Sequence, residues 1–315
     1  MLNKKHLLTC TLSALLITAC GGSSSEDSDD AALPSFSLAV SDAPVDDLSE
    51  VIVCFNQIEL KGNSTDTVFT VGNEEGMIAT NDLCLDNSGD VIPNTVGLDL
   101  LQYTGSDSIA LVDGISIEAG DYTQLRLIMS DGSYGIDAQT SDKISVSVPS
   151  NELKLDGFTA TLGGTVDFTL EFDLNKGMTN PVGQAGYFLK PRGVRLVNNN
   201  EAGHITGSVS ETLLIENQCT PLAEPSTSTA SVYIYQGADL TIESLEDNGG
   251  DATNNLPYAS AAVTFDNEQL SYNFAIGFIK TGAYTVAVTC DTEDDPELEL
   301  PELPQVLDQP VLCAL

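Results

Sequence analysis

The sequence predicts an all-β protein with two β-sandwich-like domains, and two observations carry this prediction. In residues 166–174 five apolar side chains alternate with Asp167, Thr169, Glu171 and Asp173. This period of two gives a strand one buried face and one face in water. Secondly, Gly, Asn and Asp turn signals interrupt the chain at short intervals. Many short strands joined by such turns are typical of a sandwich or barrel-like domain.

The same patterns predict the elements in order. We expect strands near residues 36–41, 51–55, 144–148, 166–174, 190–197, 203–209, 231–235, 261–265, 270–274 and 284–288. A short helix is expected over residues 95–102. No long segment has a helical period of 3.6 residues, so helices are a minor part of the prediction.

A change in composition predicts the boundary between the two domains. Asparagines occupy residues 198–200, and Lys280 is the one basic residue that follows them, against 19 acidic residues. We therefore expect domains over residues 35–198 and 199–315, the second being a small sandwich.

The N-terminus has the features of a secretory signal. Lys4 and Lys5 precede a mostly apolar run over residues 7–19, which is too short to cross a hydrocarbon core of about 30 Å as a helix. The run ends in Leu16-Ile-Thr-Ala-Cys20, which resembles the bacterial lipobox. The resemblance implies that residues 1–19 are removed and that Cys20 is acylated, with an ordinary cleavage site beside a chance cysteine as the alternative.

The residues that follow Cys20 predict a tether. Residues 21–30 contain no apolar residue, so residues 20–34 are expected to join the lipid to the first domain as a flexible linker. Several acyl chains on one cysteine make a stable membrane anchor. Gly21 follows the cysteine instead of Asp, a pattern that resembles lipoproteins exported to the outer membrane.

Charge excludes one class of partner. After Cys20 the chain has 9 basic and 47 acidic residues, a net charge of about −38. Such a surface repels nucleic acid at long range, so nucleic-acid binding is excluded.

The remaining cysteines predict disulfides, because their spacing matches no zinc pattern and the export signal indicates an oxidising compartment. We expect Cys54–Cys84, which closes a loop of about 30 residues and adds roughly 3–4 kcal/mol in the chain-entropy treatment. Cys219–Cys290 is expected as well, with Cys313 as a competitor for either partner.

Catalytic patterns are missing from the sequence. His204 is the one histidine after the signal, so no histidine-based nucleophile triad is predicted. Paired carboxylates are expected by chance among 47 acids, and the chain has no Trp for a sugar platform, so a carboxylate-dependent glycoside hydrolase is kept only as an alternative.

Calcium is the one cofactor for which fragments of a site exist. Asp86 and Asp90 enclose a glycine turn, as do Asp247 and Asp251. Each pair supplies oxygen ligands but is only part of a calcium loop, and solvated turn acids are the alternative. Around Pro44, the acids Asp42, Asp46 and Asp47 are expected to make turn hydrogen bonds.

Aromatic residues on the second domain allow two interpretations. Tyr272, Phe274, Ile276 and Phe278 lie two residues apart, as do Tyr233 and Tyr235. The pattern predicts a core face, with a sugar-stacking strip as the alternative.

Several segments in residues 36–198 resemble the bacterial domain of unknown function 4382. They include Phe36-Ser-Leu-Ala-Val-Ser-Asp-Ala-Pro44, Asp131-Gly-Ser-Tyr134 and Gly186-Tyr-Phe-Leu-Lys-Pro191. The resemblance implies a bacterial lipoprotein and no assigned activity. A phrase shared by residues 118–125 and 280–287, with Gly two residues before Tyr, resembles the strand entries of carboxypeptidase-regulatory-like, transthyretin-like and starch-binding-like sandwiches.

Together these inferences predict a protein that is not an enzyme. We expect an outer-membrane lipoprotein that presents acidic β-sandwich modules and binds a glycan or a protein of the cell envelope. A purely structural envelope lipoprotein is the main alternative.

Overall fold

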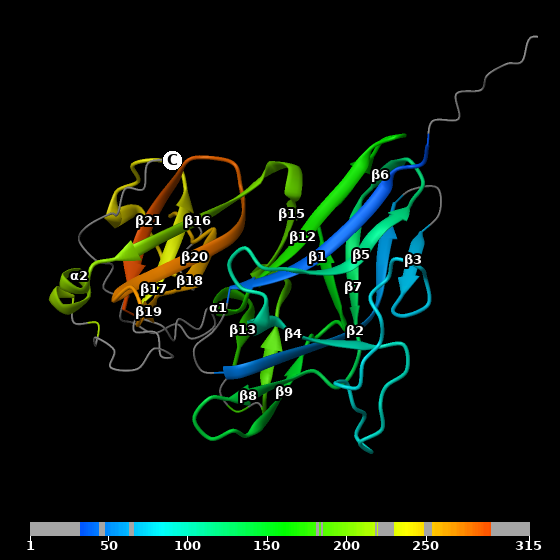
Figure 1. Ribbon diagram of the computed structural model, residues 1–315, viewed down its shortest axis with the longest axis horizontal. Coiled ribbons are helices and arrows are strands. Elements are labelled where there is room, and N and C mark those ends of the chain that lie inside the picture. The colour runs from blue at the N-terminus through cyan, green and yellow to red at the C-terminus, as the bar shows by residue number, and fades with distance from the viewer. Residues whose placement is uncertain are drawn as a thin grey trace, which may run out of the picture. The chain divides into compact units, whose positions relative to one another are not determined.

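A computed structural model describes residues 32–43, 48–62, 66–180, 183, 185–217, 219, 230–248 and 254–290 (Figure 1). The predictions for residues 1–31 and for Asp46, Asp47, Asp251 and Cys313 fall outside these residues. The all-β prediction is confirmed, because the described chain forms strands β1–β21 with only short helical segments between them.

Strands β1–β15, which we call the first sandwich, are formed by residues 35–198. Their bounds are β1 Ser35–Ala43, β2 Leu48–Lys61, β3 Thr67–Thr70, β4 Val96–Asp99, β5 Ile109–Ser116, β6 Gly120–Tyr122, β7 Gln124–Met129, β8 Tyr134–Asp137, β9 Lys143–Ser147, β10 Glu152–Leu155, β11 Phe158–Ala160, β12 Thr165–Asp173, β13 Met178–Thr179, β14 Tyr187–Leu189 and β15 Val194–Asn198. Helix α1 spans Leu174–Gly177, and 3-10 turns span Leu100–Gln102, Pro191–Gly193 and Asn199–Glu201.

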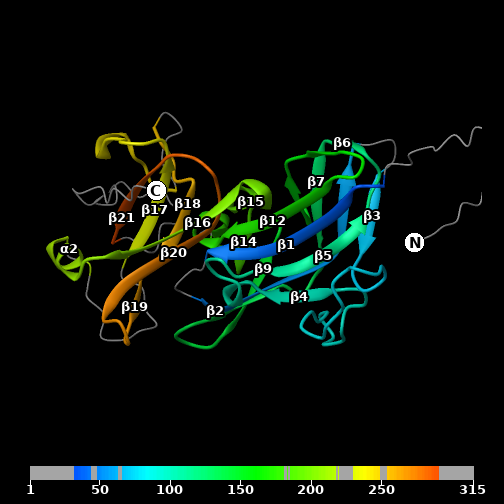
Figure 2. The same ribbon diagram turned by 45° about the horizontal axis from the view of Figure 1, so that its top comes forward.

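Two sheets enclose the core of the first sandwich. One has the order β15-β12-β1-β5, with β1 parallel to β12 (Figure 2). The larger has the order β10-β7-β2-β8-β9-β14-β13, with β3 and β4 also paired to β2. The apolar sides of both sheets form one cluster that includes Phe36, Phe55 and Phe172. Burial of these alternating side chains is the main force that holds the sheets together.

Strands β16–β21, the second sandwich, have a separate core. The bounds are β16 Ala202–Val209, β17 Ser231–Gln236, β18 Ala259–Ala262, β19 Thr264–Asp266, β20 Ser271–Lys280 and β21 Tyr284–Thr289, with α2 at Glu211–Glu216 and a 3-10 turn at Ile242–Ser244. The sheets have the orders β16-β20-β19 and β18-β17-β21. Their cluster contains only residues after position 200, so the cores divide where the composition changes.

The aromatic residues of the second sandwich are buried, as the core-face interpretation requires. Tyr272, Phe274 and Ile276 lie in the main cluster, and Tyr233 and Tyr235 pack on the other face of β17. The alternation ends at a bulge, because Phe278 has a φ of 45° and the pairing of β16 with β20 shifts there. Ile279 therefore enters the core, and Phe278 packs against His204 instead.

Two local predictions were wrong. Residues 96–99 form strand β4 on β2, and only Leu100–Gln102 are helical, because Val96 and Leu98 are buried against β2. The polar face of β12 is not in water either. Thr169, Glu171 and Asp173 are each at most 1% exposed, because Asn199 and the second sandwich lie over them.

The two sandwiches also meet at a close backbone approach. Gly277 of β20 faces the carbonyl oxygen of Gly105, which follows β4, and a Cβ at position 277 would overlap that oxygen. Gly277 is therefore fixed by packing between the sandwiches.

We expect Gly277→Ala to lower the free energy of unfolding by about 1–3 kcal/mol, because the added methyl group forces the two backbones apart. Denaturant unfolding of Gly277→Ala beside Gly203→Ala measures this. Gly203 lies on the neighbouring strand β16, and a Cβ there would meet no atom within 4 Å. Equal losses for the two variants would contradict the packing role.

Candidate functional site

The first sandwich has a polar groove of about 730 Å³ at one end of its larger sheet. It lies between the loop at residues 85–89 and the turn at residues 130–133, with β9 along one side. Side chains with hydrogen-bonding groups line it, namely Asp86, Asn87, Ser88, Ser130, Asp131, Ser133, Tyr134, Lys143, Ser145, Ser147 and Asn151. We call it the disulfide groove, since the Cys54–Cys84 bond lies beside it.

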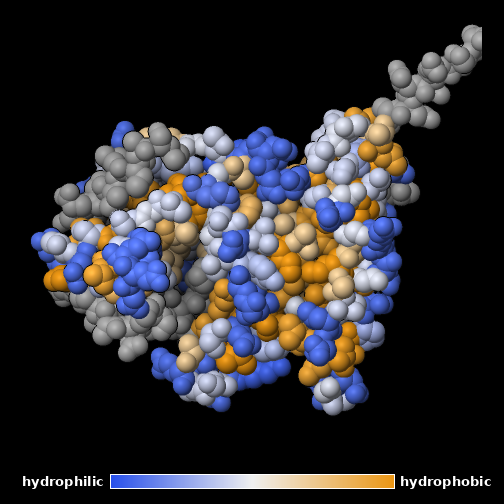
Figure 3. Space-filling model, viewed as in Figure 1, coloured by the Kyte–Doolittle hydropathy of each residue, from blue (hydrophilic) through white to orange (hydrophobic). Residues whose placement is uncertain are grey.

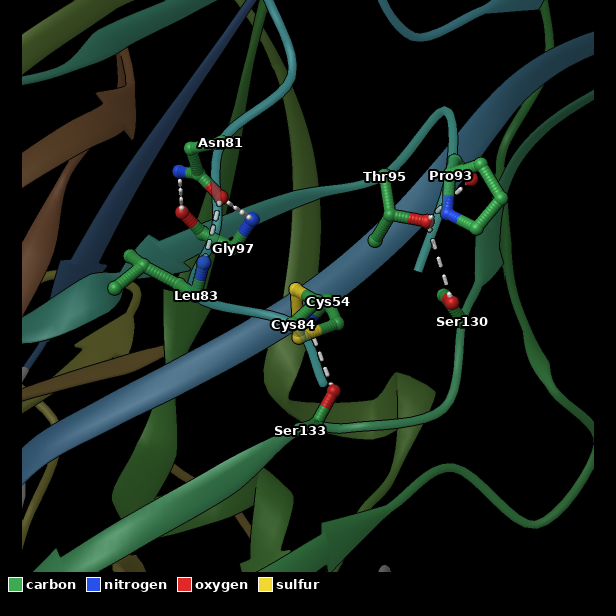
Figure 4. Close-up of a disulfide and its surroundings, with 9 residues drawn as sticks. All are labelled: Cys54, Asn81, Leu83, Cys84, Pro93, Thr95, Gly97, Ser130 and Ser133. Carbon is green, nitrogen blue, oxygen red and sulfur yellow. Dashed lines mark hydrogen bonds between the residues drawn. A yellow bond between two sulfur atoms is a disulfide. The ribbon is translucent and has the colours of Figure 1, made fainter. Parts of the chain in front are cut away.

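The predicted disulfide Cys54–Cys84 is confirmed, and it fixes the wall of the groove. Cys54 belongs to the buried centre of β2, and Cys84 begins the loop (Figure 4). The backbone of Cys54 also binds the opposite wall, because its N–H donates to Ser133 Oγ at 2.8 Å and its carbonyl accepts from Ser130 N at 2.9 Å. One residue of β2 thus holds both sides of the groove.

Close backbone packing sets the spacing of the two walls. Gly132 has a φ of 96°, and a Cβ there would lie 2.9 Å from the carbonyl oxygen of Leu85. Only glycine fits this approach and this φ without strain. Asn81 ties the start of the loop to β4, because its side-chain amide donates to the carbonyl of Gly97 and accepts from the N–H of Gly97 (Figure 4).

Asp86 uses one carboxylate oxygen to shape its own loop. Its Oδ1 accepts from Ser88 N at 2.8 Å and from Asp90 N at 3.0 Å, which is turn bonding. Calcium at Asp86 and Asp90 stays a prediction. Within the described residues no group of three or more His, Cys, Asp or Glu side chains could hold a metal ion. Asp247 is described, but its partner Asp251 is not.

A cation and an aromatic ring meet in the groove. Lys143 Nζ lies 3.4 Å from the centre of the Tyr134 ring, a cation–π contact. Tyr134 also packs against the Ile52, Cys54 and Cys84 cluster, and its partial burial raises the pKa of the phenol. Lys143 is exposed, so its ammonium group is accessible to a ligand that enters the groove.

The arrangement suits binding. Hydroxyl, amide and carboxylate groups line an open hollow, and no histidine is among the lining residues. His204 lies in the second sandwich, where its Nδ1 accepts from Phe278 N at 3.3 Å. The second predicted disulfide, Cys219–Cys290, is also confirmed and packs in the core of that sandwich.

The sequence did not predict a group of buried ionisable side chains between the sandwiches. Asp42 is fully buried, and neither carboxylate oxygen has a hydrogen-bond partner within the described part of the chain. Burial raises the pKa of Asp42 well above its ordinary value, and the neighbouring Glu171 and Asp173 add to the rise. Burial and the two neighbouring acids therefore both favour the protonated form of this carboxyl group. The turn hydrogen bonds predicted for Asp42 around Pro44 involve residues 44–47, which lie outside the described residues.

Glu171 belongs to the same group. Burial raises its pKa to about 8, although the charge of Arg195 and the nearby Ser41 hydroxyl act in the opposite direction. Arg195 lies opposite Glu171 in the pairing of β15 with β12. The only sequence signal was the cross-strand position of an acid and a base.

Charged side chains of the first sandwich bind β18 and the residues just before it. Asp173 accepts from the backbone N of Ser260 at 3.0 Å and from its hydroxyl at 2.8 Å. Arg195 donates to the Tyr258 carbonyl at 2.9 Å and lies over the Tyr258 ring. Lys176 donates to the Pro257 carbonyl at 2.8 Å. The bond from Ser260 N occupies a donor of the edge strand β18 that would otherwise be free to pair with another strand.

We expect Glu171→Gln to remove part of the pH dependence of stability. Folded Glu171 keeps its proton to about pH 8, whereas the unfolded group has a pKa near 4.5. The folded state therefore binds more protons between these values, so stability falls as pH rises through this window and is fully retained below it.

Urea unfolding at several pH values compares Glu171→Gln with Glu243→Gln, which removes the same charge at an exposed site. The Glu171 variant should lose less stability than the Glu243 variant between about pH 4.5 and pH 8. Parallel curves for the two would show that Glu171 has no raised pKa.

No helix within the described residues is both long enough and apolar enough to cross a membrane. No curated protein and no solved structure matches this chain. A family model with the description domain of unknown function (DUF4382) covers residues 34–191, which is half of the chain. These residues contain the disulfide groove and all of the strands that build it. The chain therefore belongs to the DUF4382 family.

Proposed function

We propose that this protein is a non-catalytic lipoprotein of the bacterial cell envelope, and that the disulfide groove binds a polar glycan. The observation that carries the proposal is the groove itself. Hydroxyl and amide groups line its open hollow, and its walls are fixed by Cys54–Cys84 and by the backbone bonds of Cys54. Fixed polar groups lose little entropy when a ligand binds.

A neutral or weakly charged glycan suits the groove better than a protein chain. The lining offers many donors and acceptors with few large apolar side chains, and the ring of Tyr134 is the one aromatic surface in it. Protein interfaces usually need apolar anchors that fill pockets. A ligand with a high negative charge is disfavoured, because Asp86 and Asp131 oppose the single cation Lys143.

The lipid anchor is supported by the order of features at the N-terminus. A basic start, an apolar run over residues 7–19 and Cys20 stand in the sequence expected of a lipoprotein signal. The purely structural lipoprotein shares this anchor and differs only in lacking a ligand. The two alternatives are therefore separated by binding, while the anchor has a test of its own.

Replacing Cys20 with Ser should release the protein from the membrane, because the thiol that takes the acyl chains is gone. Fractionation of cells and the intact mass of the purified protein measure this, with Cys10→Ser as the control, since Cys10 lies in the signal that is removed. The anchor is excluded if Cys20→Ser leaves both fractionation and mass unchanged.

The groove is tested with the chain that lacks residues 1–20, which keeps every described residue. We expect it to bind glycans on an array, and Asp131→Ala or Lys143→Ala to weaken binding by about tenfold, the cost of one charged hydrogen bond. Both side chains are exposed and line the groove, so their loss should not affect folding.

Asp113→Ala is the matched control, since Asp113 is an exposed acid on β5 outside the groove. If binding falls equally in the Asp113 variant, the loss reflects the change in net charge and not a contact in the groove. No binding by the unaltered chain would favour the structural alternative.

A further inference from the structure

Two exposed leucines lie together where the described chain begins. Leu33 is 55% exposed and Leu162 is 57% exposed. Their segments are bonded to each other, because Gly163 N donates to the Ala32 carbonyl and Ser35 N donates to the Gly164 carbonyl. We call Leu33 and Leu162, with the two segments that carry them, the leucine tip. Figure 3 shows apolar surface at this end of the first sandwich.

The two segments of the leucine tip contain no charged residue, although the protein is strongly acidic. Charged residues make up 18% of the chain, yet residues 31–41 and residues 157–166 contain none. Both segments meet at the tip. These segments add no repulsion of their own toward anionic headgroups, and the acid that bonds them is Asp121, through Thr159.

The length of chain before the tip limits where it can lie. Eleven residues, 21–31, separate Cys20 from Ala32. A chain of that length reaches at most about 40 Å when fully extended, and typically about 18 Å when it is a flexible coil. If Cys20 carries the lipid, the tip is the part of the described fold that lies nearest to the anchor along the chain.

We propose that the leucine tip contacts the bilayer surface that holds the lipid anchor. The inference rests on the proposed anchoring at Cys20, which supplies the affinity. Leu33 and Leu162 enter the interfacial region and fix which end of the first sandwich faces the membrane. Apolar side chains at such a depth are characteristic of proteins that lie on a membrane without crossing it.

The chain has no Trp, so a single introduced Trp reports the environment of one site. The experiment uses the full-length lipidated protein in phosphatidylcholine vesicles, with and without brominated acyl chains. Leu162→Trp is compared with Ile215→Trp on α2, since Ile215 has a similar exposure of 55%. Leu33→Trp is a second reporter in case Leu162→Trp disturbs the turn.

Trp at 162 should emit at shorter wavelength in vesicles and be quenched by brominated lipid at least about twofold more than Trp at 215, because only the tip reaches the acyl boundary. Leu33→Trp should behave like Leu162→Trp. Equal quenching of tip and α2 reporters in protein that floats with the vesicles overturns the inference alone. Protein that does not float overturns the anchoring, and the inference with it.

Discussion

The backbone pairing of strand β2 is the constraint on which the first sandwich depends. Over Leu48–Lys61 this strand pairs with β8 and β4 at its start and with β7 and β3 at its end. No other strand has four partners among the described residues. Cys54 lies in the middle of β2, where its backbone and its disulfide reach both walls of the groove. The position of the loop at residues 85–89 thus follows from β2, which has the most pairing partners among the described strands.

Charge is used differently on the surface and in the interior. The outer acids make the molecule strongly negative, which favours solubility. Inside, Asp173 accepts hydrogen bonds from Ser260 of β18, while Arg195 and Lys176 donate to the carbonyls of Tyr258 and Pro257 just before β18. Each of these three charges has a hydrogen-bonding partner. Within the described residues Asp42 has no such partner, and burial raises the pKa of its carboxyl group. A buried acid that stays protonated is tolerated more easily than an unpaired ion, because its desolvation cost is far smaller.

The sequence was informative wherever one side chain's environment depends on its neighbours along the strand. Alternation in residues 166–174 predicted β12. Cysteine spacing that matches no zinc pattern, together with the oxidising compartment expected from the export signal, predicted both disulfides. It failed where a distant segment decides the outcome. Glu171 and Asp173 read as solvent-facing, but the second sandwich covers them, and the bulge at Phe278 reverses the faces of β20 beyond Ile276. The groove was equally hidden, because its walls come from residues about 45 positions apart that only the pairing of β2 brings together.

The entry of the chain at β1 has a mechanical consequence. Strand β1 begins at Ser35, close to the start of the described chain, and is hydrogen-bonded to β12 on one side and β5 on the other. A pull on the N-terminus runs along this central strand, so many backbone bonds must rupture together instead of opening one at a time. If the protein is fastened at that end, as we propose, it can bear tension along β1 while the disulfide groove holds a ligand.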